Sequence, residues 1–194
     1  MNVAEVLGFI TGALCVWLLA RQNIWNWPLG IANNLLYLAV FLRSGLYADS
    51  GLQVVYVGLS AYGWFIWNRR NPAASDLKVT HTRATTWAWL VPAMALSALL
   101  LRFLLSRFTD SIVPGWDGVT TAISLGATYG QCKKLLESWW LWILVDVIYI
   151  PLYAYKGLRL TAVLYLVFLV LSIIGLRGWW RALAMKDDEE VAPA

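Results

Sequence analysis

The chain has 194 residues, of which 60% are hydrophobic and 14% are aromatic, while only 13% carry a charge. This composition is typical of a membrane-spanning protein and excludes an ordinary soluble domain. The net charge of +4 does not indicate nucleic-acid binding, because the basic residues lie between apolar segments, where they set the membrane topology.

Seven apolar segments follow one another, and each is expected to form a membrane-spanning helix. The first has no basic region before it and no small-residue cleavage site, so we expect it to be retained as a span. Trp27 and Pro28 begin the second, where proline suits a first helical turn. The seven helices are expected at about residues 3–20, 27–42, 52–67, 84–105, 116–132, 138–155 and 161–179.

The polar stretches between these segments indicate how the chain is oriented. Residues 69–83 form a long linker, in which His81 is expected to be a solvated loop residue, and residues 182–194 are expected to be a disordered tail. With seven crossings, ten of the 15 lysines and arginines fall on one side, and the other side holds Arg43, Arg102, Arg107, Lys156 and Arg159. The positive-inside rule then places the amino terminus outside and the carboxyl terminus in the cytoplasm.

The chain also repeats itself at an offset of 112 residues. Thirteen of the 43 positions from 27 to 69 are identical to their counterparts, among them the pairs Trp27 and Trp139, Gly63 and Gly175, and Trp67 and Trp179. We therefore expect a single domain, residues 1–194, with two three-helix repeats at about 1–69 and 113–181, joined by a linker and connector helix at about 70–112. Four crossings separate the repeats, so they enter the membrane from the same side, an arrangement that places a site at the bilayer midplane.

One carboxylate lies in the middle of the sixth segment, on a face of aromatic side chains. Four side chains follow one another at steps of three and four residues, so a helix places them on one face: Trp139, Trp142, Asp146 and Tyr149. An ionisable group at bilayer depth costs at least about 2.5 kcal/mol and by default marks a substrate or ion pathway. Because aromatic rings attract cations through their quadrupoles, this face predicts a site for a flat cation.

Further polar and aromatic residues complete the candidate site. Asn34 is the counterpart of Asp146 in the first repeat, and Gly30, the counterpart of Trp142, leaves room for a ring. The other candidates are Gln53, Tyr56, Trp64, Thr120 and Ser124. For Thr120 and Ser124, hydrogen bonding between helices is an equal alternative. Outside the site, four tryptophans are assigned to belts at the membrane surfaces, namely Trp87, Trp89, Trp179 and Trp180.

The sequence contains no motif for catalysis or metal binding. One histidine and two cysteines cannot form a zinc set, and no GxxxxGK phosphate loop occurs. We therefore expect a protein that is not an enzyme, with no catalytic residues, no cofactor, no bound metal and no nucleic-acid partner.

With these motifs placed, the chain resembles the PnuC family of bacterial vitamin transporters. The resemblance is carried by WPLG at 27–30, LYADSGLQVVY at 46–56, YGW at 62–64, KGLRLTAVLYLVF at 156–168 and the spacing Trp139-x-x-Trp142-x-x-x-Asp146. It implies an all-α membrane protein with seven transmembrane helices in the three-one-three, parallel-repeat arrangement of a full-length SWEET transporter. It also implies uptake of nicotinamide riboside, an NAD precursor, by facilitated diffusion, with trapping by a cytoplasmic kinase. The resemblance further implies a homotrimer in the lipid of a bacterial inner membrane.

The identity of the substrate depends on how the family signature ends. The family signature is WxxWxxxN, and in this chain its last position is Asp146 in place of asparagine. In addition, Thr128 stands where many relatives have glutamine. Relatives in the family carry thiamine, riboflavin or deoxynucleosides. A carboxylate suits the pyridinium of nicotinamide riboside or the thiazolium of thiamine. Riboflavin is neutral and bulkier, so the site favours it less. Thiamine transport, or proton-coupled uptake through Asp146, is therefore an alternative in the same class. A non-transporting membrane scaffold or receptor is the alternative from another class.

Overall fold

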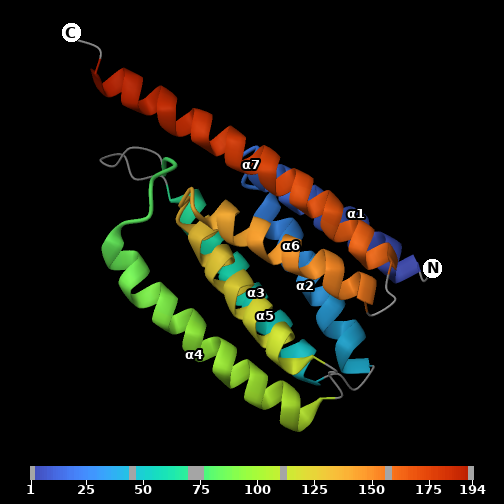
Figure 1. The fold of residues 1–194 in the computed structure, drawn as a ribbon. Helices are drawn as coiled ribbons and strands as arrows, with labels where there is room; N and C mark the ends of the chain where they lie inside the picture. The colour runs from blue at the N-terminus through green and yellow to red at the C-terminus, as the bar shows by residue number, and fades with distance from the viewer. Residues whose placement is uncertain (1–2, 44–46, 70–76, 110–112, 156–158, 192–194) are drawn as a thin grey trace.

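The computed structural model of the chain describes residues 3–43, 47–69, 77–109, 113–155 and 159–191. These residues form seven α-helices, so the predicted number and order of helices are confirmed. Figure 1 shows α4 along one edge of the bundle and α1 beside α7 along the other. The helices are α1 (Val3–Ala20), α2 (Asn26–Arg43), α3 (Tyr47–Asn68), α4 (Ala84–Phe108), α5 (Pro114–Cys132), α6 (Ser138–Tyr155) and α7 (Arg159–Val191).

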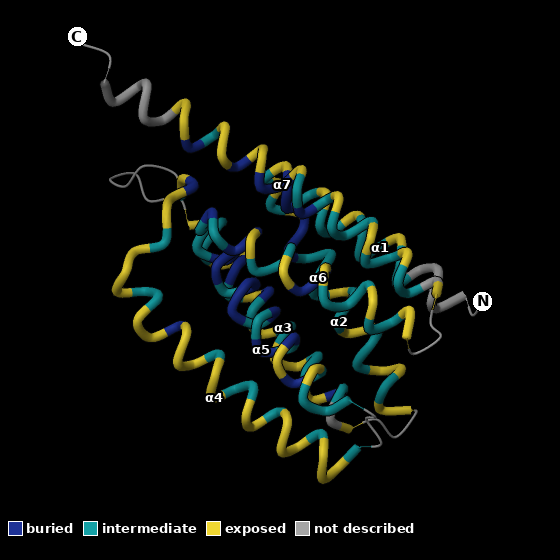
Figure 2. The backbone as a smooth tube through the Cα atoms, viewed as in Figure 1, coloured by how far each residue is buried: buried dark blue, intermediate teal, exposed yellow. Residues whose placement is uncertain are grey.

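The apolar surface of the bundle is that of a helical membrane protein. Among the described residues, three helical stretches are long and apolar enough to cross a membrane, namely Ala84–Phe108, Ser138–Tyr155 and Thr161–Met185. A shorter apolar helix covers Gly8–Ala20. Figure 2 shows exposed residues along most of α4 and buried residues concentrated on α5. A helix satisfies its own backbone hydrogen bonds, which is why an apolar helix such as α4 can lie against lipid.

The carboxyl end differs from the expectation. Residues 182–191, expected to be disordered, continue α7 to Val191. This stretch contains Ala, Leu, Met, Lys and Glu, all of which favour helices, and its first proline stands at position 193. Parts of two family motifs and of the predicted linker lie outside the described residues, within 44–46, 70–76, 110–112, 156–158 and 192–194.

The described end of the polar linker packs on the loop between α5 and α6. Thr80 forms an isolated parallel bridge with Leu135. The carboxylate of Glu137 accepts hydrogen bonds from the backbone N–H and the hydroxyl of Thr82, at 2.7 and 2.6 Å. The same carboxylate lies 2.7 Å from Nδ1 of His81, whose side chain is 66% exposed. His81 is therefore solvated, as predicted, and it also ties the linker to this loop.

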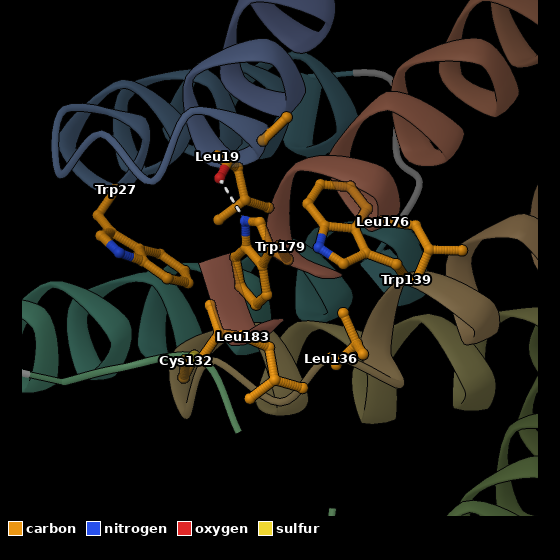
Figure 3. Packing of buried hydrophobic residues seen from close by; sticks show 10 residues of the cluster. Leu19, Trp27, Cys132, Leu136, Trp139, Leu176, Trp179 and Leu183 are labelled. Atoms are coloured by element: carbon orange, nitrogen blue, oxygen red, sulfur yellow. Dashed lines mark hydrogen bonds between the residues drawn. The ribbon is translucent and has the colours of Figure 1, made fainter. Parts of the chain in front are cut away.

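Two tryptophans anchor the core in the same way in the two halves of the chain. Trp27 packs on Gly63, where an added Cβ would lie 2.5 Å from the indole ring, and Trp139 packs on Gly175, where it would lie 2.4 Å away. Each indole also meets the edge of a second tryptophan, with ring centroids 5.4 Å apart in both halves. Figure 3 shows Trp27 and Trp139 within this buried cluster. The contacts therefore recur at the offset of the sequence repeat.

The second tryptophan of each half joins it to the other half. Nε1 of Trp67 donates to the carbonyl oxygen of Gln131 at 3.3 Å, and Nε1 of Trp179 donates to that of Leu19 at 3.3 Å. Leu19 and Gln131 are 112 positions apart, so the two hydrogen bonds correspond, and the second is drawn in Figure 3. Trp179, assigned to a membrane belt from the sequence, has no exposed surface. That assignment is wrong because its ring fills the contact between the halves.

The turns after α1 and α5 meet at the same end of the bundle. Lys134 donates from Nζ to Oε1 of Gln22 at 3.0 Å, and these two residues also stand 112 positions apart. Both have a left-handed backbone, with φ of 54° at Gln22 and 52° at Lys134. Nearby, α1 packs against α7, and α3 packs against α5. Both helix contacts join one half of the chain to the other.

Candidate substrate-binding site

Asp146 lies buried between α6 and α7. Its side chain is 2% exposed, and Oγ of Ser172 donates a hydrogen bond to its Oδ2 at 3.1 Å. The described residues give Asp146 no ion pair with a lysine or arginine. Burying a charge is costly unless it is paired with an opposite charge. The site can therefore gain free energy by binding a ligand that brings a positive charge.

In the turns of α6 that follow Asp146, aromatic rings of α6 and α7 pack together in a cluster. The rings of Tyr149 and Tyr165 have centroids 4.6 Å apart, and those of Tyr153 and Tyr165 stack at 5.1 Å with planes 6° apart. Phe168 meets the edge of Tyr165 at 5.7 Å. Tyr149 is also close enough to Asp146 to interact with it electrostatically. The carboxylate thus has π-systems beside it, the combination that suits a flat organic cation.

Hydroxyl groups of α5 connect this cluster to α3. The hydroxyl of Thr120 donates to the carbonyl of Trp116 at 2.8 Å, and that of Ser124 donates to the carbonyl of Thr120 at 2.9 Å. Their oxygens are left as acceptors, and the phenol groups of Tyr149 and Tyr56 lie close enough to Thr120 and Ser124, respectively, to interact with them. The structure thus brings the four side chains together, as either a hydrogen-bonding role between helices or a ligand contact would require.

In the other half of the chain, the corresponding aromatic side chains contact glycines of α1, where α5 has hydroxyl groups. The hydroxyl of Tyr37, the counterpart of Tyr149, lies where a side chain at Gly8 would be. Phe168, the counterpart of Tyr56, lies 3.3 Å from an added Cβ at Gly12. Thr120 and Ser124 of α5 therefore correspond to two glycines of α1. The hydrogen-bonding side of the site lies on α5.

Trp142 is one of three tryptophans, with Trp27 and Trp139, whose buried indole Nε1 has no hydrogen-bond partner among the described residues. Unlike those two, its side chain is partly exposed. A buried donor left unpaired costs about 1–3 kcal/mol. At the corresponding position, an added Cβ on Gly30 would touch only Oγ of Ser60, at 3.7 Å. The predicted room beside Gly30 is present, and Trp142 offers a donor to an acceptor group of a ligand.

The other predicted site residues lie apart from this network or make no described contact with it. Trp139 is fully buried in the tryptophan cluster, where it supports the core. Trp64 is 44% exposed on α3. Asn34 and Gln53 are partly buried on α2 and α3. Of the ten predicted residues, the structure links five by hydrogen bonds or electrostatic proximity, namely Asp146, Tyr149, Thr120, Tyr56 and Ser124.

Two members of the site were missed by the sequence reasoning. Ser172 holds the carboxylate of Asp146, and Tyr165 stacks at the centre of the aromatic cluster. The repeat carries a signal for Ser172, because it aligns with Ser60, and both serines are buried next to the second helix of their own half. Tyr165 aligns with Gln53, so the repeat could have identified it only through the predicted role of that glutamine.

Comparison with known proteins extends over nearly the whole chain. A sequence model of a family described as nicotinamide mononucleotide transporter matches residues 2–181. The riboflavin/roseoflavin transporter RibM of Streptomyces davaonensis is 30% identical, over 99% of this chain and 90% of its own length. The nicotinamide riboside transporter PnuC of Escherichia coli is 26% identical, over 90% of this chain and 84% of its own length. The crystal structure of the vitamin B3 transporter PnuC superposes with a TM-score of 0.72 at 25% identity, covering 94% of this chain and 82% of that one.

Proposed function

The chain belongs to the nicotinamide mononucleotide transporter (PnuC) family, and on that premise we propose that it carries nicotinamide riboside across the membrane. The observation that carries the choice of substrate is Asp146, a buried carboxylate that lies beside Ser172 and Tyr149 and has no basic partner among the described residues. Nicotinamide riboside brings a pyridinium cation to such a site, and π-systems beside a carboxylate favour a flat cation.

The remaining side chains fit the sugar of the substrate. The hydroxyls of Thr120, Ser124 and Tyr56 and the indole N–H of Trp142 supply acceptors and donors for ribose hydroxyl groups. Asn34 and Gln53 complete the proposed site from the first repeat, and Trp64 remains a proposed aromatic contact from α3. We assign Trp139 a supporting role, because it is enclosed in the core.

Riboflavin is the second candidate, and a specific observation favours it. The relative RibM, a riboflavin/roseoflavin transporter, is 30% identical to this chain over nearly its whole length. An isoalloxazine ring would also stack on tyrosines, and its ribityl chain would use the same hydroxyl groups. It is neutral, however, so it would leave the charge of Asp146 unpaired. Thiamine, whose thiazolium is cationic, is the third candidate.

The mode of transport that we propose is facilitated diffusion, with phosphorylation by a cytoplasmic kinase trapping the product. The two halves would rock about their contacts in a SWEET-like three-one-three arrangement, with α4 as the connector. We also propose a homotrimer in a bacterial inner membrane, with the amino terminus outside and the carboxyl terminus in the cytoplasm. The correspondence of contacts at an offset of 112 residues supports the two-repeat arrangement.

Uptake into proteoliposomes tests the proposed function. The purified chain is reconstituted, and entry of labelled nicotinamide riboside, riboflavin and thiamine is measured against protein-free vesicles. We expect saturable entry of nicotinamide riboside that excess unlabelled riboflavin does not abolish. Entry of riboflavin or thiamine alone would assign the protein to that vitamin, and entry of none of the three would favour a scaffold or receptor.

A further inference from the structure

A groove lies on the outer surface of the bundle, between α6 and α7. It has a volume of about 340 Å³ and is lined by Trp140, Leu176, Arg177, Trp180 and Arg181. Both of its tryptophans are more than half exposed, and both arginines are exposed. Neither guanidinium has an ion pair, a hydrogen bond or an aromatic partner among the described residues. The groove therefore presents two unpaired positive charges between two exposed indoles.

The depth of these arginines in the membrane follows from the length of α7. The apolar part of the helix runs over Thr161–Met185. At a rise of about 1.5 Å per residue, Arg177 lies about 24 Å and Arg181 about 30 Å beyond Thr161. The hydrocarbon core of a bilayer is about 30 Å thick, so both guanidiniums lie where acyl chains give way to headgroups. Tryptophan is enriched at this level because its ring is apolar and its N–H is polar.

We propose that this groove binds the headgroup of an anionic phospholipid from the leaflet at the carboxyl end of α7. Two arginines one turn apart can hold a phosphate through paired N–H donors, and arginine suits this geometry better than lysine does. The buried side chain of Leu176 and the flanking indoles offer apolar surface to the first carbons of the acyl chains. Basic pockets between transmembrane helices bind anionic headgroups by the same combination of charge and apolar wall.

The corresponding surface of the first repeat does not have this chemistry, which makes it an internal control. The counterparts of the groove residues are Pro28, Trp64, Phe65, Asn68 and Arg69. Only one of them is basic, and the guanidinium of Arg69 already lies 4.7 Å from the ring centroid of Phe65. A lipid site made by this chain should therefore be found once per chain, on the second repeat.

Native mass spectrometry of the detergent-solubilised full chain tests the proposal. The probes are phosphatidylglycerol and phosphatidylcholine with the same acyl chains, titrated into the wild type, the double variant R177Q/R181Q and the matched control R69Q. We expect the wild type and R69Q to bind one phosphatidylglycerol roughly tenfold or more tightly than phosphatidylcholine, which is the scale set by two basic residues at an anionic surface. The double variant should lose this preference.

Three outcomes would overturn the proposal. One is a double variant that keeps its preference for phosphatidylglycerol, and another is an R69Q variant that loses the preference to the same extent. The third is displacement of the lipid by millimolar inorganic phosphate, which would identify a site for free anions. If the double variant unfolds in detergent, the single variants R177Q and R181Q replace it, and each should lose part of the preference.

Discussion

At the scale of single residues, the site is organised around a buried carboxyl group that has no basic partner among the described residues. The sequence predicted a buried carboxylate at Asp146, and the structure confirms its burial. The sequence did not predict Ser172 as its partner, because a search for an opposite charge passes over neutral hydrogen-bond donors. A single serine satisfies part of the carboxyl group and supplies no opposite charge. We propose that the carboxylate therefore favours a cationic substrate over a neutral one of similar shape.

Trp142 should contribute through its N–H as well as its ring. Replacing Trp142 with Phe removes the buried indole donor and keeps an aromatic face. One hydrogen bond contributes about 0.5–1.5 kcal/mol, so we expect the affinity for nicotinamide riboside to fall roughly threefold to tenfold. Isothermal titration measures this change. The matched control is Trp25→Phe at a residue that is 68% exposed, and its affinity should equal that of the wild type. Equal affinity of the two variants would remove Trp142 from the site.

The aromatic residues also show where sequence reasoning stops at this scale. Trp139 and Trp142 share one helix face with Asp146, yet Trp139 is enclosed by the tryptophan cluster while Trp142 is partly exposed. Spacing along a helix gives the face of a residue, but the neighbours of that face change from turn to turn. Those neighbours come from other helices, so periodicity alone could not separate a core tryptophan from a ligand contact.

At the scale of helices, the tryptophan and glycine contacts should set the stability of each half. An added methyl group at Gly175 would lie 2.4 Å from the ring of Trp139, so Gly175→Ala forces the indole to move. Such overpacking costs about 1–3 kcal/mol. For a chain of this length the melting temperature should fall by roughly 2–10 °C. The control is Gly58→Ala in α3, where nothing lies within 4 Å of the added Cβ.

Thermal unfolding in detergent compares the two alanine variants. Gly58→Ala should leave the melting temperature unchanged or raise it, because alanine favours a helix by about 1 kcal/mol over glycine. If both variants melt with the wild type, the packing of Trp139 on Gly175 is looser than its geometry indicates.

The docked linker should make stability depend on pH. Burial opposes ionisation of Glu137, but hydrogen bonds from Thr82 and His81 outweigh it and hold the pKa of this carboxyl below its usual range. Such a group stabilises the folded state above its unfolded pKa, about 4.3, and the stabilisation is lost as the pH falls through the lower folded pKa. Glu137→Gln should therefore melt a few degrees below the wild type near neutral pH. Below about pH 4 the two should converge. A gap of constant size across this range would contradict the role of the ionised carboxylate.

Helix positions were more predictable than helix contacts. The bounds of α1 and α6 agree with the predicted spans, because an arginine follows the first span and polar residues precede the sixth. The docking of the linker through Thr80 and Glu137 was not predicted. It joins residues about 55 positions apart, and nothing local in either segment signals the other. The same applies to the last turns of α7, where a charged composition indicated disorder but the helix continues.

At the scale of the whole molecule, a symmetric core surrounds an asymmetric site. The hydrogen bonds of Trp67 and Trp179 correspond at the 112-residue offset of the sequence repeat. The polar contacts do not correspond, because the positions of Thr120 and Ser124 on α5 are occupied by glycines in the corresponding helix α1. Symmetric contacts are suited to rocking of two halves, and an asymmetric lining is suited to a substrate with a charged end and a hydroxylated end. We expect the substrate to lie with its hydroxyl groups toward α5.

Facilitated diffusion makes a prediction for the whole molecule that does not depend on the orientation of the termini. In proteoliposomes with an imposed pH gradient, nicotinamide riboside should enter until the inside and outside concentrations are equal. The pH gradient should change neither that endpoint nor its direction. Accumulation above the external concentration would show that proton movement drives uptake, and Asp146 would then be the first residue to test as the proton carrier.

The most direct test of the central claim changes only the charge of the ligand. Nicotinamide riboside and its reduced dihydropyridine form have nearly the same shape, but only the oxidised form is cationic. Titration of the purified wild-type chain should show the oxidised form binding at least about tenfold more tightly, the scale of one charged hydrogen-bonding contact. In Asp146→Asn this preference should disappear while the melting temperature stays within a few degrees of the wild type. Equal affinities of the wild type for both forms, or an unchanged preference in Asp146→Asn, would contradict the claim that Asp146 recognises the positive charge of the substrate.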